Sequence, residues 1–424
     1  MSAATQEIDI PRLIQDGRIL PQFQPLVSVR RRAILGYEGL SRGLQPENGG
    51  VIPADRLFRE ASAAGLTHEL DQACRQRILG HFSFLHRGAA GSVLSLNMDA
   101  ASAIARWAGT SELDAQVAQA GLTAKDIVIE IVESAVEDTA ELQRFVQAHR
   151  ESGYLIALDD VGSGHSNLNR IPLIRPDIIK IDRYLVEGIH QDFFKQEVLK
   201  SLVSMARHLG TVIIAEGVET ADEGSLLFGM GVDLFQGYFF ARPSGAREQD
   251  SAAVQARIGE ISAQAKSQQM QKVTLKRISM CRRRQLLSLV QASLSLEKPP
   301  DFERVLTGTA LPLQTVECLY VLNLAGHQVT SMVFNSALAP LRRSSMFHPL
   351  PKGADHSMRD YYYFLADETP AQVFYVTKPY ISMTTGIPCV TLSARFKAAD
   401  GQDYILCLDV NEPLASIPAS AEES

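Results

Sequence analysis

The sequence predicts an α/β barrel of the TIM type followed by a smaller α+β domain. Through residues 11–246, apolar runs of strand length alternate with helix-like stretches, which is typical of a parallel sheet or barrel. The length of this block is close to the roughly 250 residues that one such barrel takes. After residue 299 the pattern changes to alternating β runs separated by turn residues, which predicts a second domain.

Six apolar runs in the first block have a polar residue at or near their end. They are residues 37–40, 93–97, 127–134, 155–160, 178–182 and 212–220. In a barrel of parallel strands these ends converge on one face, where the chemistry of such barrels sits. We therefore expect one shared site, made by Glu38, Asn97, Glu130, Asp159, Asp160, Lys180 and Glu216.

Helix signals lie between these runs. They cover residues 54–79, 138–150 and 196–209. Gly153 and Gly210 follow the last two stretches closely, at the position where glycine suits the end of a helix.

Residues 247–298 are predicted to form a connecting helix, because the stretch to about residue 290 lacks proline and is rich in Ala and Gln. Residues 266–284 hold seven basic and no acidic side chains. This basic stripe has three interpretations: a solvated face of the connecting helix, a contact for anionic lipid or nucleic acid, or a surface for the carboxylates of a partner barrel.

Residues 299–413 are predicted to form the smaller domain, with a helix near residues 302–308 and then an antiparallel sheet. The β runs read ECLYVLNLAGHQVTSMVF, PAQVFYVTKPYISM, PCVTLSARF and YILCLDV. Turn signals separate them, which favours short connections between neighbouring strands.

Composition excludes several classes of protein. A net charge of −7 argues against broad nucleic-acid binding, so we expect no DNA partner. Five scattered cysteines without a CxxC pair argue against a disulfide framework or a zinc site. We find neither a signal peptide pattern nor an apolar run long enough to span a membrane, and we expect a cytoplasmic protein.

The predicted set of side chains suits divalent cations that act on a phosphate ester. Carboxylate and carboxamide oxygens are the hard ligands that Mg²⁺ and Mn²⁺ prefer, and no His or Cys lies among them. Two such ions about 3.5–4 Å apart neutralise a phosphate, activate a water and stabilise the leaving oxygen. Lys180, surrounded by acids, would position the attacking water or the phosphate.

The barrel block resembles a known family over residues 11–245. The motifs are FQPLVSVRRRAILGYEGLSRG, IEIVES, ALDDVGSGHSNL, PDIIKIDR, IIAEGVET and FQGYFFARP, in the right order and spacing. They are similar to those of the EAL domain, the phosphodiesterases that linearise cyclic di-GMP. The resemblance implies a TIM-like barrel with one early strand antiparallel, dimerisation, and a two-metal site for Mg²⁺ or Mn²⁺ that Ca²⁺ inhibits.

The resemblance also implies a role for each site residue. Metal ligands would be Glu38, Asn97, Glu130 and Asp159, with Asp160 serving the second ion. Lys180 would lie near the nucleophilic water, and Glu216 would be the general base or a further ligand. For the nucleotide, Arg42 would hold a phosphate, and Gln24 and Leu40 would lie near a guanine. Gln236 would line the site, and Glu133 would anchor the loop of residues 159–167.

The chain departs from the family pattern at a few positions. Gly39 stands where the family has Ala, at a cost of only a methyl group, and Ser41 replaces an apolar residue. Val161 and His165 replace aromatic residues in the loop that would organise the second ion. Two hypotheses follow: an enzyme that hydrolyses cyclic di-GMP to linear pGpG, or a catalytically weak or inactive receptor that signals through protein contacts. An adaptor that binds neither ion nor nucleotide is a third, which the retained acids oppose.

The C-terminal block resembles a PAS or Cache-type sensor fold that would regulate the barrel. Its candidate ligand-pocket residues are Tyr361, Tyr362, Lys378, Tyr380 and Ser382. The alternative is that these are half-buried sheet residues of a dimerisation domain.

Overall fold

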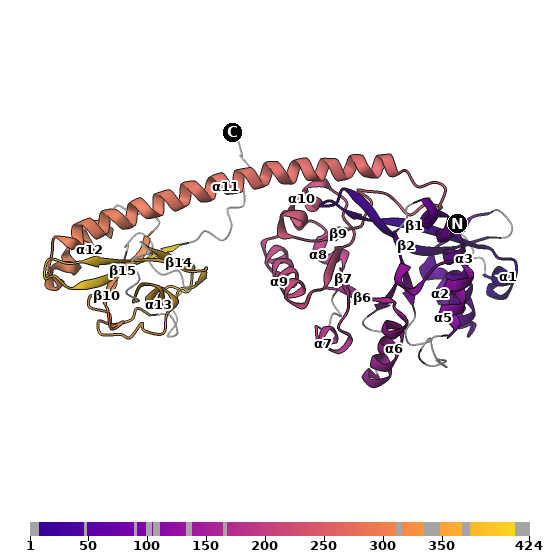
Figure 1. Ribbon diagram of the computed structural model, residues 1–424, viewed down its shortest axis with the longest axis horizontal. Helices are drawn as coiled ribbons and strands as arrows, with labels where there is room; N and C mark the ends of the chain where they lie inside the picture. Colours follow the sequence, from indigo (N-terminus) through magenta and orange to yellow (C-terminus); the bar gives the residue numbers. More distant parts are fainter. Residues whose placement is uncertain are drawn as a thin grey trace, which may run out of the picture. The chain divides into compact units, whose positions relative to one another are not determined.

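The computed structural model describes residues 8–45, 49–88, 91–98, 104, 111–132, 138–163, 168–310, 316–334, 348–366 and 374–411 (Figure 1). The chain divides into two compact units, Met1–Gln269 and Met270–Ser424. Helix α11 (Ser251–Ser295) includes the point of division. Within the described segments, no helix combines the length and the apolar character needed to cross a membrane.

The first unit is a closed barrel of eight strands. They are β1 (Ile19–Ser28), β2 (Ala33–Leu44), β4 (Val93–Met98), β5 (Ile127–Val132), β6 (Leu155–Val161), β7 (Ile178–Ile181), β8 (Val212–Ala215) and β9 (Leu234–Phe235). The order is β1-β9-β8-β7-β6-β5-β4-β2, and the pairing of β1 with β2 closes it. Strand β1 is antiparallel to both neighbours, and the other neighbouring pairs around the barrel are parallel. The predicted TIM-like barrel with one antiparallel strand is confirmed. A short strand, β3 (Val51–Ile52), extends β2.

Helices accompany the barrel strands. They are α1 (Ile10–Gln15), α2 (Ala54–Ala63), α3 (Thr67–Gly88), α5 (Ser111–Gln119), α6 (Thr139–Ser152), α7 (Arg170–Ile174), α8 (Arg183–Val186), α9 (Phe193–Leu209) and α10 (Ala221–Met230), with a 3₁₀ turn at Ala124–Asp126. Helices α6 and α9 confirm two predictions, and Gly153 and Gly210 end them with φ of 99° and 72°. The single helix predicted for residues 54–79 is wrong, because the chain breaks it at Gly65, where φ is 70°.

The second unit is built on an antiparallel sheet, as predicted. Its strands are β10 (Val316–Asn323), β11 (Val333–Phe334), β12 (Tyr375–Val376), β13 (Tyr380–Ile381), β14 (Pro388–Lys397) and β15 (Asp403–Asn411). The order is β11-β10-β15-β14-β12, with β13 on β14. Apolar residues of one sheet face share a core with the last turns of α11 and with α12 (Phe302–Ala310), which follows a 3₁₀ turn at Pro299–Asp301. A second core joins the other face to α13 (Asp360–Ala366), which the sequence did not predict.

The candidate pocket residues of this domain make hydrogen bonds within the chain. The Tyr320 hydroxyl donates to Tyr361 at 3.1 Å, the Tyr380 hydroxyl lies 2.6 Å from the Thr391 hydroxyl, and Ser382 donates to Glu317 at 2.6 Å. The Tyr362 hydroxyl donates to a backbone carbonyl, and Lys378 is exposed. A ligand for these side chains remains a prediction.

Candidate active site

Two layers of side chains fill the interior of the barrel. One layer is an apolar cluster formed by Leu26, Val128, Ala157, Ile178 and Ile214. Because side chains two apart on a strand share a face, the next inward residues are those two positions further along. On the four parallel strands these are Glu130, Asp159, Lys180 and Glu216. On the antiparallel β1 the equivalent step runs backwards from Leu26 and reaches Gln24, so all five strands present a polar group at the same end.

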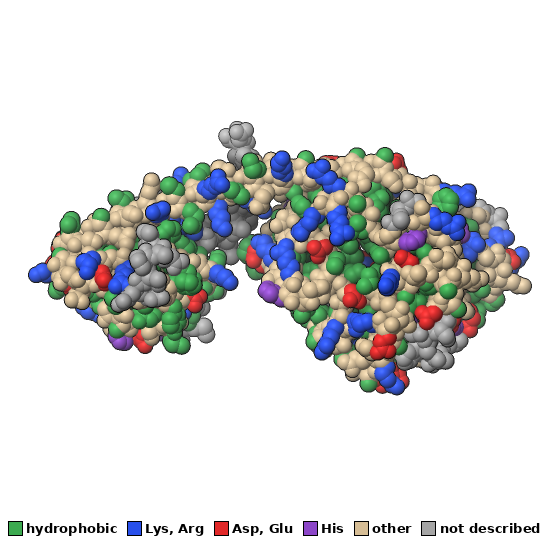
Figure 2. Space-filling view, in the orientation of Figure 1, with side chains coloured by type: hydrophobic (Ala, Val, Ile, Leu, Met, Phe, Trp, Pro, Cys, Tyr) green, Lys and Arg blue, Asp and Glu red, His purple; other side chains and the backbone are tan. Residues whose placement is uncertain are grey.

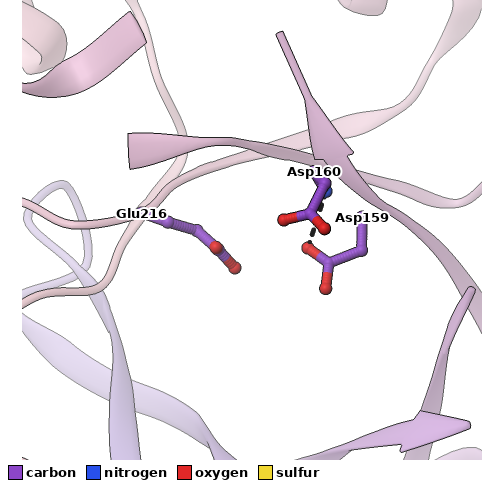
Figure 3. Close-up of side chains that lie close together, drawn as sticks. All are labelled: Asp159, Asp160 and Glu216. Carbon is purple, nitrogen blue, oxygen red and sulfur yellow. Dashed lines mark hydrogen bonds between the residues drawn. The ribbon is translucent and has the colours of Figure 1, made fainter. Parts of the chain in front are cut away.

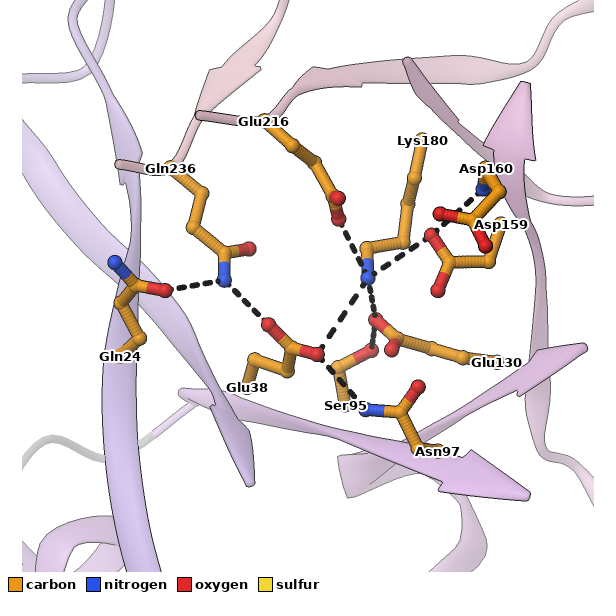
Figure 4. Close-up of polar contacts among 10 residues, drawn as sticks. All are labelled: Gln24, Glu38, Ser95, Asn97, Glu130, Asp159, Asp160, Lys180, Glu216 and Gln236. Atoms are coloured by element: carbon orange, nitrogen blue, oxygen red, sulfur yellow. Dashed lines mark hydrogen bonds and ion pairs between the residues drawn. The ribbon is translucent and has the colours of Figure 1, made fainter. Parts of the chain in front are cut away.

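Lys180 lies at the centre of four carboxylates (Figure 4). Its Nζ is 2.6 Å from Glu216 Oε1, 2.7 Å from Glu130 Oε1, 3.2 Å from Asp159 Oδ1 and 3.7 Å from Glu38 Oε1. The side chains of Lys180 and Glu130 are 1% and 0% exposed. We call Glu38, Glu130, Asp159 and Glu216 the acid ring. It holds four acids for one cation, so the ring has room for further positive charge.

Asp159 and Asp160 both turn toward this end of the barrel because β6 is irregular there. The register with β7 shifts between Leu158 and Val161, and Asp160 has a φ of 56°. Such a bulge re-aims neighbouring side chains that would otherwise point to opposite faces. One oxygen each from Asp159, Asp160 and Glu216 lies within 4.8 Å of the others (Figure 3). This spacing suits a shared cation.

A chain of amide side chains orients Glu38. Asn97 Nδ2 donates to Glu38 Oε1 at 2.8 Å, and Gln236 Nε2 donates to Glu38 Oε2. Gln236 Nε2 also lies 2.9 Å from Gln24 Oε1, and Gln24 in turn donates to the Ala241 carbonyl at 3.0 Å. Each oxygen of Glu38 therefore accepts a hydrogen bond from an amide side chain, which fixes the orientation of the carboxylate (Figure 4).

A cavity of about 330 Å³ is lined by Leu40, Arg42 and Asn97, together with residues of α2 and α3. Leu40 and Arg42 follow Glu38 at intervals of two on β2, so they continue the same face toward the end of the strand. Arg42 Nη1 donates to the Ser41 carbonyl at 2.9 Å. The cavity walls therefore combine an apolar surface with a guanidinium group next to the acid ring.

Burial and the crowding of like charges shift the pKa values of these groups. Burial raises the pKa of Glu216 to about 8, against the attraction of Lys180. Burial likewise raises the pKa of Glu130 well above its ordinary value, and that of Asp160 to a smaller extent. Burial also opposes the ionisation of Glu38. The positive charge of Lys180 and the hydrogen bonds from the amide side chains outweigh the effect of burial, so the pKa of Glu38 is lowered. Burial opposes the charge of Lys180, but the surrounding carboxylates raise its pKa well above the ordinary value.

We expect the metal-free protein to lose stability as the pH rises from about 5 to 8. Glu216 titrates near 4.5 when unperturbed and at about 8 in the fold, so in this window the folded state keeps a proton that the unfolded chain has released. Urea denaturation in EDTA at pH 5, 6.5 and 8 measures the decline, which should exceed about 1 kcal/mol. Glu216→Gln should make the decline smaller, and Glu130 and Asp160, whose pKa values burial also raises, should account for what remains. An equal decline in that variant would contradict the assignment.

The residues of the site fit divalent cations. Glu130 Oε2 is buried and finds no hydrogen-bond partner among the described residues, which is costly unless a positive group approaches it. The neighbouring donors are carboxylate and carboxamide oxygens, the hard ligands that Mg²⁺, Mn²⁺ and Ca²⁺ accept.

The structure brings most of the predicted site residues together. They are Gln24, Glu38, Asn97, Glu130, Asp159, Asp160, Lys180, Glu216 and Gln236, with Leu40 and Arg42 in the adjoining cavity. Glu133 and His165 lie outside the described residues. Sequence reasoning missed Ser95, which donates to Glu130 Oε1 at 2.5 Å. Its position two residues before Asn97 on β4 was the available signal, since it places both on one face.

Gly39 is closely packed, so an added methyl group would require a neighbouring side chain to shift and the replacement of Ala by Gly involves more than the loss of a methyl group. A Cβ at Gly39 would lie 2.5 Å from Ile78 Cγ2 and 3.2 Å from Leu94 Cδ1. We expect Gly39→Ala to destabilise the protein by about 1–3 kcal/mol in urea denaturation, because Ile78 must shift. Adding Ile78→Leu, which removes the γ2 branch, should recover part of the loss.

A matched control for this prediction is Gly229→Ala, on an open face of α10 where nothing lies within 4 Å. This substitution should not destabilise the protein. Additive effects of Gly39→Ala and Ile78→Leu would contradict the assigned clash.

Comparisons with known proteins agree with this geometry. The family model described as "EAL domain" matches residues 8–243. The chain is 30% identical over 246 residues to the probable cyclic di-GMP phosphodiesterase PdeG of Escherichia coli (strain K12), which covers 57% of this chain and 48% of that protein. The chain thus spans about half the length of that relative.

Two solved structures share the fold. The Bacillus subtilis YkuI protein, described as having an EAL domain and as a complex with substrate c-di-GMP and calcium, aligns with a TM-score of 0.77 at 22% identity. That alignment covers 96% of this chain and 99% of YkuI, so it includes both units. Klebsiella pneumoniae BlrP1, a calcium/cy-diGMP complex, aligns with a TM-score of 0.50 at 27% identity over 58% of this chain and 59% of BlrP1.

Proposed function

Because the chain belongs to the EAL domain family, we propose that it is a phosphodiesterase that hydrolyses cyclic di-GMP to linear pGpG with the help of divalent cations. One observation carries the proposal: the acid ring and Lys180 lie at one end of the barrel, beside the cavity that contains Leu40 and Arg42. The similarity to PdeG, a probable cyclic di-GMP phosphodiesterase, and the complexes of YkuI and BlrP1 with cyclic di-GMP and calcium support it.

The cations would be held by the side-chain oxygens gathered here. Glu38, Asn97, Glu130 and Asp159 would be metal ligands and Asp160 would serve the second ion, with Mg²⁺ or Mn²⁺ as the active metals and Ca²⁺ as an inhibitor. When bound, such ions neutralise the phosphate, lower the pKa of water and stabilise the leaving oxygen.

The chain's own residues would bind the substrate and move the proton. Arg42 suits a phosphate oxygen because its guanidinium group presents several donors, and Leu40 offers an apolar contact for a guanine. Gln24 and Gln236 hold Glu38 in place through their hydrogen bonds. Glu216 is the candidate proton acceptor, since burial raises its pKa to about 8, close to the working pH of a general base. Lys180 Nζ would orient the water.

An activity assay tests the proposal. Purified protein is incubated with cyclic di-GMP in Mg²⁺, Mn²⁺, Ca²⁺ or EDTA, and the product is separated by chromatography. We expect linear pGpG with Mg²⁺ or Mn²⁺ and none with Ca²⁺ or EDTA. Absence of product over hours, with cyclic di-GMP still bound, would reject the enzyme.

The receptor is the second candidate, and one observation favours it. Lys180 contacts all four carboxylates of the acid ring and thereby supplies a counter-charge without any ion. A site stabilised in this way would bind a ligand without turning it over. Calorimetry that shows tight binding and full recovery of intact cyclic di-GMP would favour the receptor. Val161→Phe should then raise turnover.

The remaining assignments extend this proposal. We propose an EAL barrel over residues 11–246, a connecting helix over 247–298 and a regulatory domain over 299–413, in a homodimer in the cytoplasm. Glu133 would anchor the loop that follows Asp159. Comparing the turnover of the full chain with that of a chain ending at residue 269 would test the regulation, because equal rates would exclude it.

A further inference from the structure

A groove of about 880 Å³ on the barrel unit shares no residue with the acid ring or with the cavity beside it. It lies between α3, the start of β1 and the segment that precedes α11. The side chains used below are Arg77, His81, Phe84, Arg87, Arg247 and Glu248. All of them belong to the first unit.

The groove carries an excess of positive charge. Arg77, Arg87 and Arg247 are exposed, and within the described residues none of the three pairs with a carboxylate. Glu248 is the one acidic residue among those that line the groove, and it accepts a hydrogen bond from the Gly245 N–H at 3.1 Å within its own turn. Three guanidinium groups therefore face the groove in a chain whose net charge is −7.

One face of α3 supplies most of these groups. Arg77, His81, Phe84 and Arg87 recur at intervals of three and four, so they lie along one side of the helix. Ile78 and Phe82, on the opposite side, are buried in the barrel core. Phe84 is 56% exposed, so packing in the barrel core does not explain why this position holds a large aromatic side chain.

Phe84 and Arg247 lie against each other within the groove. The Arg247 guanidinium carbon lies 5.3 Å from the centre of the Phe84 ring, the geometry of a cation–π contact. This contact joins α3 to the segment before α11 and places an aromatic ring beside a guanidinium group.

We propose that this groove binds a nucleoside phosphate. Arg77 Nε donates to the Ile19 carbonyl at 3.3 Å, but no described carboxylate pairs with Arg77, Arg87 or Arg247. Such arginines suit phosphate, because a guanidinium group offers donors to two oxygens at once. An exposed aromatic ring beside an arginine suits a base, which stacks on either group. The volume falls in the range of small-ligand sites, about 300–1,000 Å³. The net negative charge of the chain opposes a long nucleic acid as the occupant. This inference does not depend on the proposed hydrolysis.

Calorimetry on the full chain with GMP, at low salt and with EDTA, tests the proposal. We expect one GMP per chain and an affinity at least about tenfold higher than that for guanosine or inorganic phosphate alone, since each of these lacks one half of the contact. Raising the salt from 50 to 200 mM should weaken binding, because the contact is electrostatic and exposed.

Substitutions locate the binding. The pair Arg87→Gln and Arg247→Gln should lower GMP affinity at least about tenfold, and Phe84→Leu should weaken GMP but not inorganic phosphate. Arg59→Gln, which removes an exposed arginine of α2 outside the groove, should change nothing. Thermal melting confirms that the variants fold. Absence of binding at millimolar GMP would overturn the proposal. The proposal would also fail if Arg42→Gln abolished GMP binding while the groove variants still bound GMP normally, because the nucleotide would then occupy the cavity beside the acid ring.

Discussion

Glu38→Gln is expected to lower cyclic di-GMP turnover at least about 100-fold while leaving the barrel folded. Glu38 touches Lys180, Asn97 and Gln236, and its pKa is lowered, so it is an ionised acid held in place by donors. Glutamine keeps the size of the side chain and one carbonyl oxygen, but it removes the negative charge that a divalent cation requires. Formation of pGpG under saturating Mg²⁺ measures the loss.

A surface glutamate provides the control for this prediction. Glu141 lies on α6 in an exposed pair with Arg144, 3.7 Å away. Glu141→Gln should keep the wild-type rate, because an exposed pair of this kind contributes little. If Glu38→Gln retained wild-type turnover, Glu38 could not be a metal ligand. Circular dichroism would show whether Glu38→Gln folds. If that variant did not fold, Glu38→Asp would be used in its place. The same loss of turnover is expected for Glu38→Asp, because the shorter side chain moves the carboxylate oxygens away from the cation.

Lys180→Met is expected to destabilise the metal-free protein by about 3–5 kcal/mol, since it removes the counter-charge of the ionised acids of the ring, above all Glu38, whose pKa Lys180 helps to lower. Lys180 is 1% exposed and lies within 4 Å of an oxygen from each of the four acids. Urea denaturation in EDTA at pH 7.5 measures the change. Added Mg²⁺ should recover part of the loss, because a divalent cation supplies positive charge in the same place.

Lys200→Met is the matched control. Lys200 pairs with Glu197 at 2.6 Å, but both side chains are almost half exposed. Its removal should cost less than about 1 kcal/mol, and Mg²⁺ should not change that cost. Equal losses for the two lysines would mean that burial does not set the strength of the Lys180 contacts, and the account of the acid ring would fail.

Strand positions and inward-facing residues were predictable from the sequence. The runs that end in Glu130, Asp159, Lys180 and Glu216 contain enough apolar residues to mark buried strands, and the period of two then fixes the face of each side chain. The antiparallel direction of β1 came from the resemblance alone. Hydrophobic pattern carries no information on strand direction when both faces of a strand are buried.

Features that depend on packing between distant residues were not predictable. The close packing at Gly39 arises from Ile78, which lies far from it in sequence and reaches it only in the barrel. The arginine groove joins residues of α3 to Arg247 in the same way. In each case the deciding contact exists only after folding.

The position of bound metal tests the central claim most directly. Crystals grown with cyclic di-GMP and Mn²⁺ would be examined by anomalous scattering at the manganese edge. The account predicts two peaks a few ångströms apart at the barrel mouth, bonded to oxygens of Glu38, Asn97, Glu130, Asp159 and Asp160. Manganese bound only elsewhere, or cyclic di-GMP bound at the mouth with no metal beside the acid ring, would contradict it.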